Sequence, residues 1–210
     1  GDQMQNLTPE YWEIGKKSLK EIDVNMRKII DLYEFPALTT RGDIFFTLIR
    51  SIVGQQISVK AADTVWNKLA KELGEISPEI IFSMDKDVMR NCGISGRKIE
   101  YMKSVSEKWL NGYDQINWHE LSDELVISKL VEIRGIGKWT AEMILIFTLM
   151  RQDIFPMGDI GAIRALEKIY NEGEKMDKKQ IEEIVVKWKP WRTIATWYLW
   201  RSIDPEPVQY

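Results

Sequence analysis

Apolar residues recur along this chain at helical spacing, and strand-like alternation bounded by turn residues is absent from the sequence. Apolar positions three or four residues apart line one face of a helix. The chain is therefore predicted to be all-α. The expected helices span residues 9–22, 26–33, 43–53, 58–73, 77–84, 86–91, 97–110, 121–133, 138–150, 159–170, 178–189 and 191–203.

Local signals mark some helix ends. Thr8 is a suitable N-cap, with Pro9 at the first helical position. Ser58 can cap the helix that follows the turn at residues 54–57. Pro190 must break or restart the helix before it, because proline lacks the N–H that a helix interior needs.

The segment Ile133–Ala141 lies between two apolar-rich segments and contains Gly135 and Gly137. Two helices joined by a tight turn are the simplest interpretation, because glycine can adopt positive φ and lets a ligand approach the backbone. A helix that begins at about Lys138 presents unpaired N–H groups and the positive end of its dipole. With Arg134 and Lys138 beside it, this turn is predicted to bind an anion such as a DNA phosphate.

We expect two helical lobes with a cleft between them and the two-helix hairpin at the edge of that cleft. Lobe A would comprise about residues 1–46 and 134–210, and lobe B about residues 47–133. The sequence contains no internal repeat and no low-complexity segment, so a single functional unit of 1–210 is predicted.

Composition narrows the classes of protein. Cys92 is the only cysteine among 210 residues, which excludes an intramolecular disulfide and a four-cysteine metal or iron–sulfur site. With a single cysteine, a reducing cytoplasm is the default location, nucleoid-associated in a prokaryote. No apolar run reaches the roughly 20 residues that span a bilayer. The net charge of −3 argues mildly against nucleic acid. Phosphate binding, however, needs only a local basic patch.

The hairpin resembles the helix-hairpin-helix motif of the DNA glycosylase superfamily. The residues that carry the resemblance are Leu130, Ile133, Gly135, Ile136, Gly137, Thr140 and Ala141. In that superfamily a Gly/Pro-rich loop with a catalytic aspartate follows the second helix, and here Phe155–Asp159 follows at about the expected distance. The resemblance covers about residues 43–201. It implies phosphate binding by Arg134, Gly135, Gly137, Lys138 and Thr140.

Asp159 is the predicted catalytic residue. It precedes a helix, where aspartate is a favourable N-cap, and this structural role does not exclude catalysis. Cleavage of an N-glycosidic bond builds positive charge on the sugar, which a fixed carboxylate stabilises. Asp153 is the nearest alternative and is expected to be a surface turn residue. Glu142, on the second hairpin helix, can face either solvent or the cleft.

Trp139 indicates which nucleophile is used. Members of the superfamily with lyase activity carry a lysine two positions after the second hairpin glycine, and that lysine forms a Schiff base. In this chain the position is Trp139, and Lys138 is about 100° away around the helix. The resemblance therefore implies a monofunctional enzyme that uses water. It also places Trp139 in the base pocket, with core packing as the alternative.

The tail Trp188–Arg201 is similar to the end of the 3-methyladenine DNA glycosylase II family, in which the tryptophan nine positions after a Pro-Trp pair lines the base pocket. Here that residue is Trp200. Trp197 and Met143 are further pocket candidates, and core packing is equally expected for Trp197. Met143 and Ile160 stand where that family has aromatic residues, so the range of substrates stays open.

Two turns in the middle of the chain are further DNA-binding candidates. The turn at Gly54–Ile57 resembles the family's loop that fills the gap left by a flipped base, and Gln56 matches the wedge position. A polar turn between helices is the alternative. Gly93–Lys98 is a weaker candidate for binding phosphate. The only histidine, His119, is expected at the surface, without a cluster of metal ligands around it.

The resemblance implies a monofunctional DNA glycosylase that removes alkylated purines from duplex DNA. The alternatives are a glycosylase for oxidised or mismatched bases and a non-catalytic DNA-binding module. Asp159 argues against the module, because binding alone does not require it. We expect a monomer without a cofactor and without a membrane partner. The hairpin carbonyls could coordinate a monovalent cation.

Overall fold

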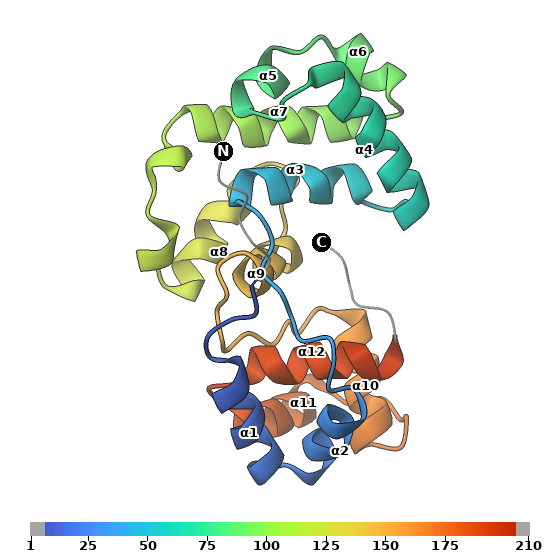
Figure 1. Ribbon diagram of the computed structural model, residues 1–210, viewed down its shortest axis with the longest axis vertical. Coiled ribbons are helices and arrows are strands. Elements are labelled where there is room, and N and C mark those ends of the chain that lie inside the picture. The colour runs from blue at the N-terminus through green and yellow to red at the C-terminus, as the bar shows by residue number, and fades with distance from the viewer. Residues whose placement is uncertain (1–6, 205–210) are drawn as a thin grey trace. The chain divides into compact units, whose positions relative to one another are not determined.

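The computed structural model describes residues 7–204, and this part of the chain is helical, without a strand. The predicted all-α class is therefore confirmed. The chain divides into two compact units (Figure 1). Unit 1 runs up to Thr40 and resumes at Leu145, and unit 2 comprises Arg41–Ile144. The hairpin at residues 133–141 thus belongs to unit 2, whereas the sequence had placed most of it in lobe A.

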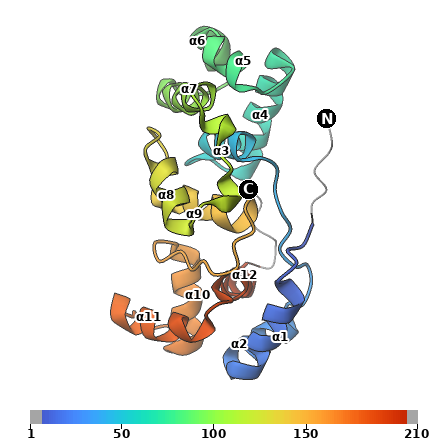
Figure 2. The same ribbon diagram turned by 90° about the vertical axis from the view of Figure 1, so that its left-hand side faces the viewer.

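Unit 1 is built around one helix, α12. Its helices are α1 (Trp12–Ile22), α2 (Val24–Leu32), α10 (Ile160–Tyr170), α11 (Lys178–Val185), the 3-10 turn η3 (Val186–Trp188) and α12 (Arg192–Ile203). Helix α12 contacts α1, α2 and α10 (Figures 1 and 2). Residues 193–201 are all buried, so the helix has no solvent face and no amphipathic pattern.

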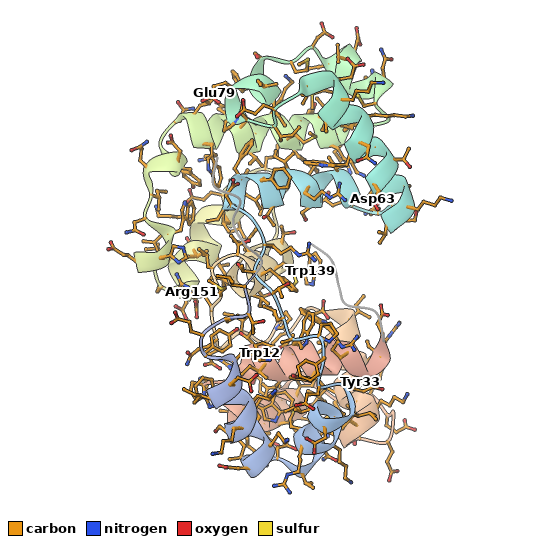
Figure 3. The ribbon with its side chains drawn as sticks, viewed as in Figure 1. Trp12, Tyr33, Asp63, Glu79, Trp139 and Arg151 are labelled. Carbon is orange, nitrogen blue, oxygen red and sulfur yellow. The ribbon has the colours of Figure 1, made fainter. Side chains whose placement is uncertain are left out.

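Aromatic packing joins α1 to α12. Trp12 lies at the start of α1 (Figure 3). Its ring contacts those of Trp197 and Tyr198, at centroid distances of 6.4 and 5.9 Å. The two helices approach closely at Gly15, where a Cβ atom would lie 2.4 Å from Ile194 Cδ1. A larger residue at position 15 would push α1 away from α12.

Unit 2 is organised around α7. Its elements are α3 (Ile44–Gly54), α4 (Val59–Leu73), α5 (Pro78–Ser83), α6 (Lys86–Asn91), α7 (Gly96–Leu110), η1 (Tyr113–Gln115), η2 (Trp118–Glu120), α8 (Asp123–Val131) and most of α9 (Lys138–Phe147). Helix α7 lies alongside α3 and also contacts α5 and α6 (Figures 1 and 2). No helix in the described part of the chain is long and apolar enough to cross a membrane.

Side-chain caps fix most helix starts, as the sequence predicts for Ser58, whose Oγ accepts a hydrogen bond from Ala61 N. The prediction for Thr8 and Pro9 was wrong, because α1 begins at Trp12 and its N-cap, Tyr11, makes no side-chain cap. Leu7 O accepts a hydrogen bond from Thr40 N at 2.8 Å. This long-range bond fixes the chain before the helix, and residues 10 and 11 form a turn instead.

The helix predicted at 178–189 was also too long. Helix α11 ends at Val185, and the next three residues form the 3-10 turn η3. Trp188, the last of these, donates its indole N–H to Asp23 Oδ2 at 2.8 Å. This contact with the residue that caps α2 accounts for the early end of the α-helix, since the tighter turn places the buried indole.

Candidate active site and nucleic-acid interface

Asp159 is held by hydrogen bonds at the start of α10. It is the N-cap, as predicted, and its Oδ2 accepts a hydrogen bond from Ala162 N at 2.8 Å. The same oxygen accepts a second one from Trp200 Nε1 at 2.7 Å. Asp159 is only 9% exposed. The carboxylate is thus fixed in orientation by its own helix and by a side chain 41 residues further along the chain.

Trp200 is positioned by a second aromatic ring. Its indole stacks on Phe147 with a centroid distance of 5.9 Å and an interplanar angle of 7°. At Gly161 a Cβ atom would lie 3.5 Å from Asp159 Oδ2 and 3.7 Å from Trp200 Cδ1, so glycine leaves room around this pair. Sequence analysis missed Phe147, because nothing distinguishes it within the apolar segment that contains it.

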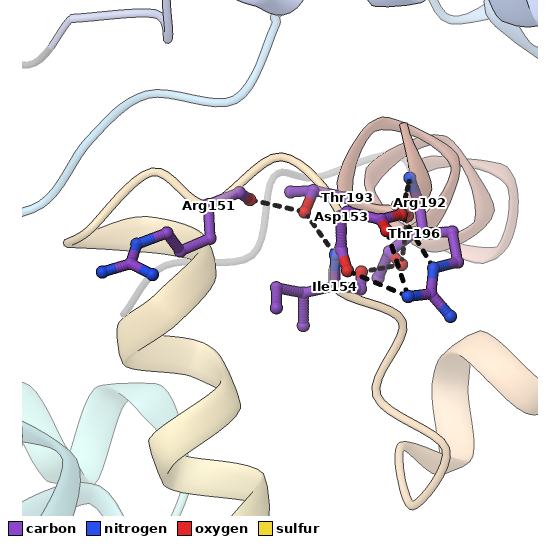
Figure 4. A network of polar contacts seen from close by, with 6 residues as sticks. All are labelled: Arg151, Asp153, Ile154, Arg192, Thr193 and Thr196. Atoms are coloured by element: carbon purple, nitrogen blue, oxygen red, sulfur yellow. Dashed lines mark hydrogen bonds and ion pairs between the residues drawn. The ribbon is translucent and has the colours of Figure 1, made fainter. Parts of the chain in front are cut away.

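The loop that leads to Asp159 is tied to the start of α12 (Figure 4). Thr193 Oγ1 donates to Arg151 O at 2.6 Å and accepts from Ile154 N at 2.9 Å. Thr196 Oγ1 donates to Ile154 O at 3.1 Å. The two hydroxyls of α12 therefore fix the backbone of the loop, and Trp200 on the same helix contacts the carboxylate that follows it.

Asp153 belongs to this network. Arg192 donates from Nε to Asp153 Oδ1 at 2.8 Å and from a terminal nitrogen to Oδ2 at 3.1 Å. A two-point ion pair of this kind is geometrically specific. It gives Asp153 a structural role in holding the loop, which is consistent with its rejection as the catalytic residue.

Trp197 lies deeper in unit 1 and is 3% exposed. Its ring packs edge-to-face against Trp12 and Phe147, and its indole N–H donates to Pro36 O at 3.2 Å. Packing accounts for all these contacts, so the predicted place of Trp197 in a base pocket stays a prediction.

The hairpin of unit 2 uses positive φ at only one of its two glycines, and each glycine serves a different purpose. Gly135 has φ +92°, and a Cβ there would lie 2.3 Å from the ring of Tyr101. Gly137 does not have positive φ, and a Cβ there would find no heavy atom within 4 Å. The fold therefore requires glycine at position 135. At position 137 the space next to the backbone is open, so a ligand can approach it. Tyr101 was missed, since no local signal links it to the hairpin.

The predicted phosphate-binding residues around the hairpin differ in exposure. Arg134, Gly137 and Lys138 are exposed, and Arg134 pairs with Glu100 at 3.5 Å across the surface. Thr140 is buried, with only 7% of its surface exposed, so its side chain does not face solvent. The first bond within the second helix runs from Ala141 N to Gly137 O at 3.1 Å. The N–H groups of residues 138–140 therefore precede the hydrogen-bond ladder of α9, as a phosphate site requires.

Helix α9 carries the remaining candidates of the hairpin. Trp139 is half-buried. Met143 and Glu142 are buried, with 3% and 7% of their surface exposed. Of the two orientations left open for Glu142, the structure thus excludes the solvent-facing one. The roles of Trp139 and Met143 in a base pocket stay predictions.

The turn between α3 and α4 presents Gln56 to solvent. Gln56 is exposed and has φ +59°, which is uncommon for a residue other than glycine. Ile57 and Val59 beside it are 40% and 74% exposed. An exposed turn with a polar tip and apolar flanks fits the predicted wedge, although it does not test that role.

The remaining candidates are simpler. Lys98 donates from Nζ to Val53 O at 2.9 Å, so its ammonium is directed to a helix end instead of to open solvent. Burial lowers the pKa of Lys98. His119 lies exposed on η2, as expected. Among the described residues, no group of three or more His, Cys, Asp or Glu side chains is arranged to hold a metal ion.

The site residues therefore fall into two groups. Asp159, Trp197 and Trp200 come together in unit 1, where α12 organises them. The hairpin residues and Gln56 belong to unit 2. Each group is internally consistent with the role predicted for it: a buried, fixed carboxylate in the first, and exposed backbone and basic side chains in the second.

Comparisons with known proteins identify the family of the chain. The chain is 35% identical over 195 residues to DNA-3-methyladenine glycosylase 1 of Schizosaccharomyces pombe, covering 88% of this chain and 84% of that protein. The structure is similar to that of a DNA-3-methyladenine glycosidase from Bacillus halodurans, with a TM-score of 0.81, 32% identity, and coverage of 96% of this chain and 93% of that one.

It is also similar to a Schizosaccharomyces pombe 3-methyladenine DNA glycosylase solved in complex with abasic DNA, with a TM-score of 0.78 and 30% identity. That match covers 94% of this chain and 100% of the other. The family profile described as HhH-GPD superfamily base excision DNA repair protein matches residues 49–190. The chain belongs to the HhH-GPD superfamily of base excision DNA repair proteins.

Proposed function

We propose that this protein is a monofunctional DNA glycosylase that hydrolyses the N-glycosidic bond of alkylated purines in duplex DNA, as the first step of base excision repair. The observation that carries the proposal is the carboxylate of Asp159, fixed by Ala162 N and Trp200 Nε1. The names of the similar proteins support 3-methyladenine as a representative substrate.

The chemistry of the substrate suits this site. When the bond from the sugar C1′ to the base nitrogen breaks, the bonding electrons leave with the base and positive charge develops on the sugar. A fixed anion stabilises that charge. Alkylation at N3 or N7 makes the purine cationic, so it departs as a neutral base and needs no general acid. Water then forms the new bond to C1′ and releases a proton.

Unit 2 would bind the DNA. The turn at the start of α9, with Arg134 and Lys138, contacts phosphates, and these contacts are independent of sequence. Gln56 enters the base stack and fills the gap that the flipped nucleotide leaves. Flipping costs a few kcal/mol, and contacts of this kind offset that cost.

The absence of a lysine at position 139 supports hydrolysis without strand cleavage, because no amine stands where lyases of the superfamily carry theirs. The proposed reaction requires no cofactor, and a monomer suffices for it. The protein would act where the DNA is, which in a prokaryote is the cytoplasm.

A panel of duplexes, each with one lesion, tests the proposal. Alkylated, deaminated, oxidised and mismatched bases are incubated with the protein, and abasic sites are detected by alkaline cleavage. We expect release of 3-methyladenine or 7-methylguanine, and far slower release by Asp159→Asn. Release of oxidised or mismatched bases alone would favour the alternative glycosylase. Binding without release of any base would favour the non-catalytic module.

A further inference from the structure

Helix α3 ends directly before the turn that carries Gln56, and one of its last carbonyls, Val53 O, is bound by a side chain of another helix. Lys98 reaches from α7 and donates from Nζ to Val53 O at 2.9 Å. The final carbonyls of a helix have no partner within it, and they form the negative end of its dipole. A lysine at this place therefore satisfies a carbonyl and places a positive charge where the helix favours one.

The turn beyond this contact has few hydrogen bonds of its own. Gln55 N donates to Ile52 O at 3.2 Å, and Ile57 N donates to Gly54 O at 3.5 Å, which is long. Between them Gln56 holds φ +59°, a conformation that residues other than glycine adopt only when their surroundings enforce it. The conformation of the turn thus depends on what fixes its base.

Lys98 is itself well fixed. It is the third residue of α7, and its backbone N–H donates to the N-cap Ser95 Oγ at 3.3 Å. Its side chain is half-buried, and burial lowers its pKa. Helix α7 packs along α3. The start of the most connected helix in unit 2 therefore holds the base of the Gln56 turn.

We propose that Lys98 is a positioning residue for Gln56: by binding the carboxyl end of α3, it holds the turn in the conformation that inserts Gln56 into DNA. This inference rests on the proposed function, in which Gln56 fills the gap left by the flipped base. It replaces the weaker expectation that Lys98 binds phosphate, because the ammonium already donates to a carbonyl.

The same helix offers a matched control. Lys103 also projects from α7, and its Nζ donates to the carbonyls of Ile81, Phe82 and Met84 at the end of α5. Burial likewise lowers the pKa of Lys103. Both Lys98→Met and Lys103→Met therefore remove bonds from an ammonium to the carbonyls at a helix end. The helix end bound by Lys98 leads to Gln56, and the one bound by Lys103 does not.

The test compares single-turnover excision from two duplexes. In one the lesion pairs with a normal base, and in the other it lies opposite an abasic site, where no partner base has to be separated. For Lys98→Met we expect excision to be about ten-fold slower on the paired duplex and less than about two-fold slower on the other duplex. The size of the effect follows from the strength of a hydrogen bond to a charged group, whose loss changes a rate by roughly ten- to a hundred-fold. Lys103→Met should change both rates equally. Lys98→Arg, which keeps charge and donors, should restore the excision rate on the paired duplex and so remove the difference between the two duplexes.

A double variant with Gln56→Ala completes the design, since residues that act through one another are not additive. In the Gln56→Ala background, Lys98→Met should cause little further loss. Equal losses on both duplexes, or additive losses with Gln56→Ala, would overturn the inference. A reduced salt dependence of binding to undamaged DNA would instead assign Lys98 to a phosphate.

The variants also separate this inference from the function on which it rests. If the unmodified protein releases no lesion, the proposed function fails. If it releases lesions and Lys98→Met shows no preference between the duplexes, only the role of Lys98 fails. Should Lys98→Met not fold, Lys98→Gln is the replacement, because its amide is too short to reach the same carbonyl.

Discussion

The proposed catalytic site in unit 1 and the proposed DNA-binding segments of unit 2 are built in opposite ways. Asp159 is buried, and two N–H groups converge on one of its oxygens. Gln56, Gly137 and Lys138 are exposed. Stabilising charge in a transition state requires a group whose orientation is fixed beforehand. Contacting a phosphate requires backbone that a large ligand can reach.

This difference predicts that substitutions in the two regions affect different steps of the reaction. Changes around Asp159 should reduce the rate of the chemical step and leave DNA binding intact. Changes in the hairpin should weaken binding of every duplex and leave the chemical step of bound DNA intact.

Asp159→Asn should have the largest effect. An asparagine side chain can still cap α10, but it carries no charge to stabilise the sugar cation. We expect the excision rate to fall by at least about 10² to 10³-fold, the range found when one electrostatic stabiliser is removed. Single-turnover kinetics measure the rate, and anisotropy with lesion DNA checks that binding persists.

Asp153→Asn is the matched control for that variant. It removes a carboxylate six positions earlier that pairs with Arg192 and only holds the loop. Its rate should fall far less. If Asp159→Asn excised the lesion as fast as the unsubstituted protein, Asp159 would be excluded as the catalytic residue.

Trp200→Phe should have the next largest effect. Phenylalanine keeps a ring to stack on Phe147 but cannot donate to Asp159 Oδ2. A hydrogen bond to a charged group is worth about 1.5–3 kcal/mol, so excision should slow by about ten- to a hundred-fold. The loss should be similar for cationic and neutral lesions. An unchanged rate would mean that α10 alone orients the carboxylate.

Trp200→Leu sharpens the same test by removing the aromatic face as well. If Trp200 also recognises the base, this variant should lose a further two- to thirty-fold or so on 3-methyladenine relative to neutral hypoxanthine, because a tryptophan face attracts a cation. Equal losses on both lesions would restrict Trp200 to positioning Asp159.

The two hairpin glycines should respond differently to alanine. Gly137→Ala adds a methyl group where no protein atom lies within 4 Å, so we expect unchanged thermal stability and several-fold weaker binding of damaged and undamaged duplexes. Gly135→Ala forces a side chain against Tyr101 at φ +92° and should destabilise the fold by about 1–3 kcal/mol. Thermal unfolding and anisotropy separate the two outcomes. Weaker binding of damaged DNA alone by Gly137→Ala would contradict phosphate contact.

The smallest expected signal is an absence of covalent trapping. Because Trp139 occupies the position of the lyase lysine, borohydride should trap no complex with lesion DNA, while abasic sites still accumulate. Denaturing gels resolve any trapped band. A band that disappears in Lys138→Met would show that the neighbouring lysine serves as an amine nucleophile.

The sequence by itself determined the helices, most of their starts and the identity of the family. Ser58 and Asp159 cap their helices as predicted, because a capping side chain bonds to a backbone N–H only three residues away. The hairpin and the loop before Asp159 were recognised for a similar reason, since their residues are close neighbours in the chain. Thr8 failed because a hydrogen bond between Leu7 and Thr40 overrode the local signal.

Tertiary structure alone decided which side chains serve the recognised motifs. Trp200 donates to Asp159 across 41 residues, Thr193 holds the loop at Ile154 across 39, and Lys98 holds the end of α3 across 45. Tyr101 requires glycine at position 135, and nothing near either residue in the chain indicates it. Each of these contacts depends on how two helices pack, and packing angles and offsets are set by the whole core of a unit, which no short stretch of sequence encodes.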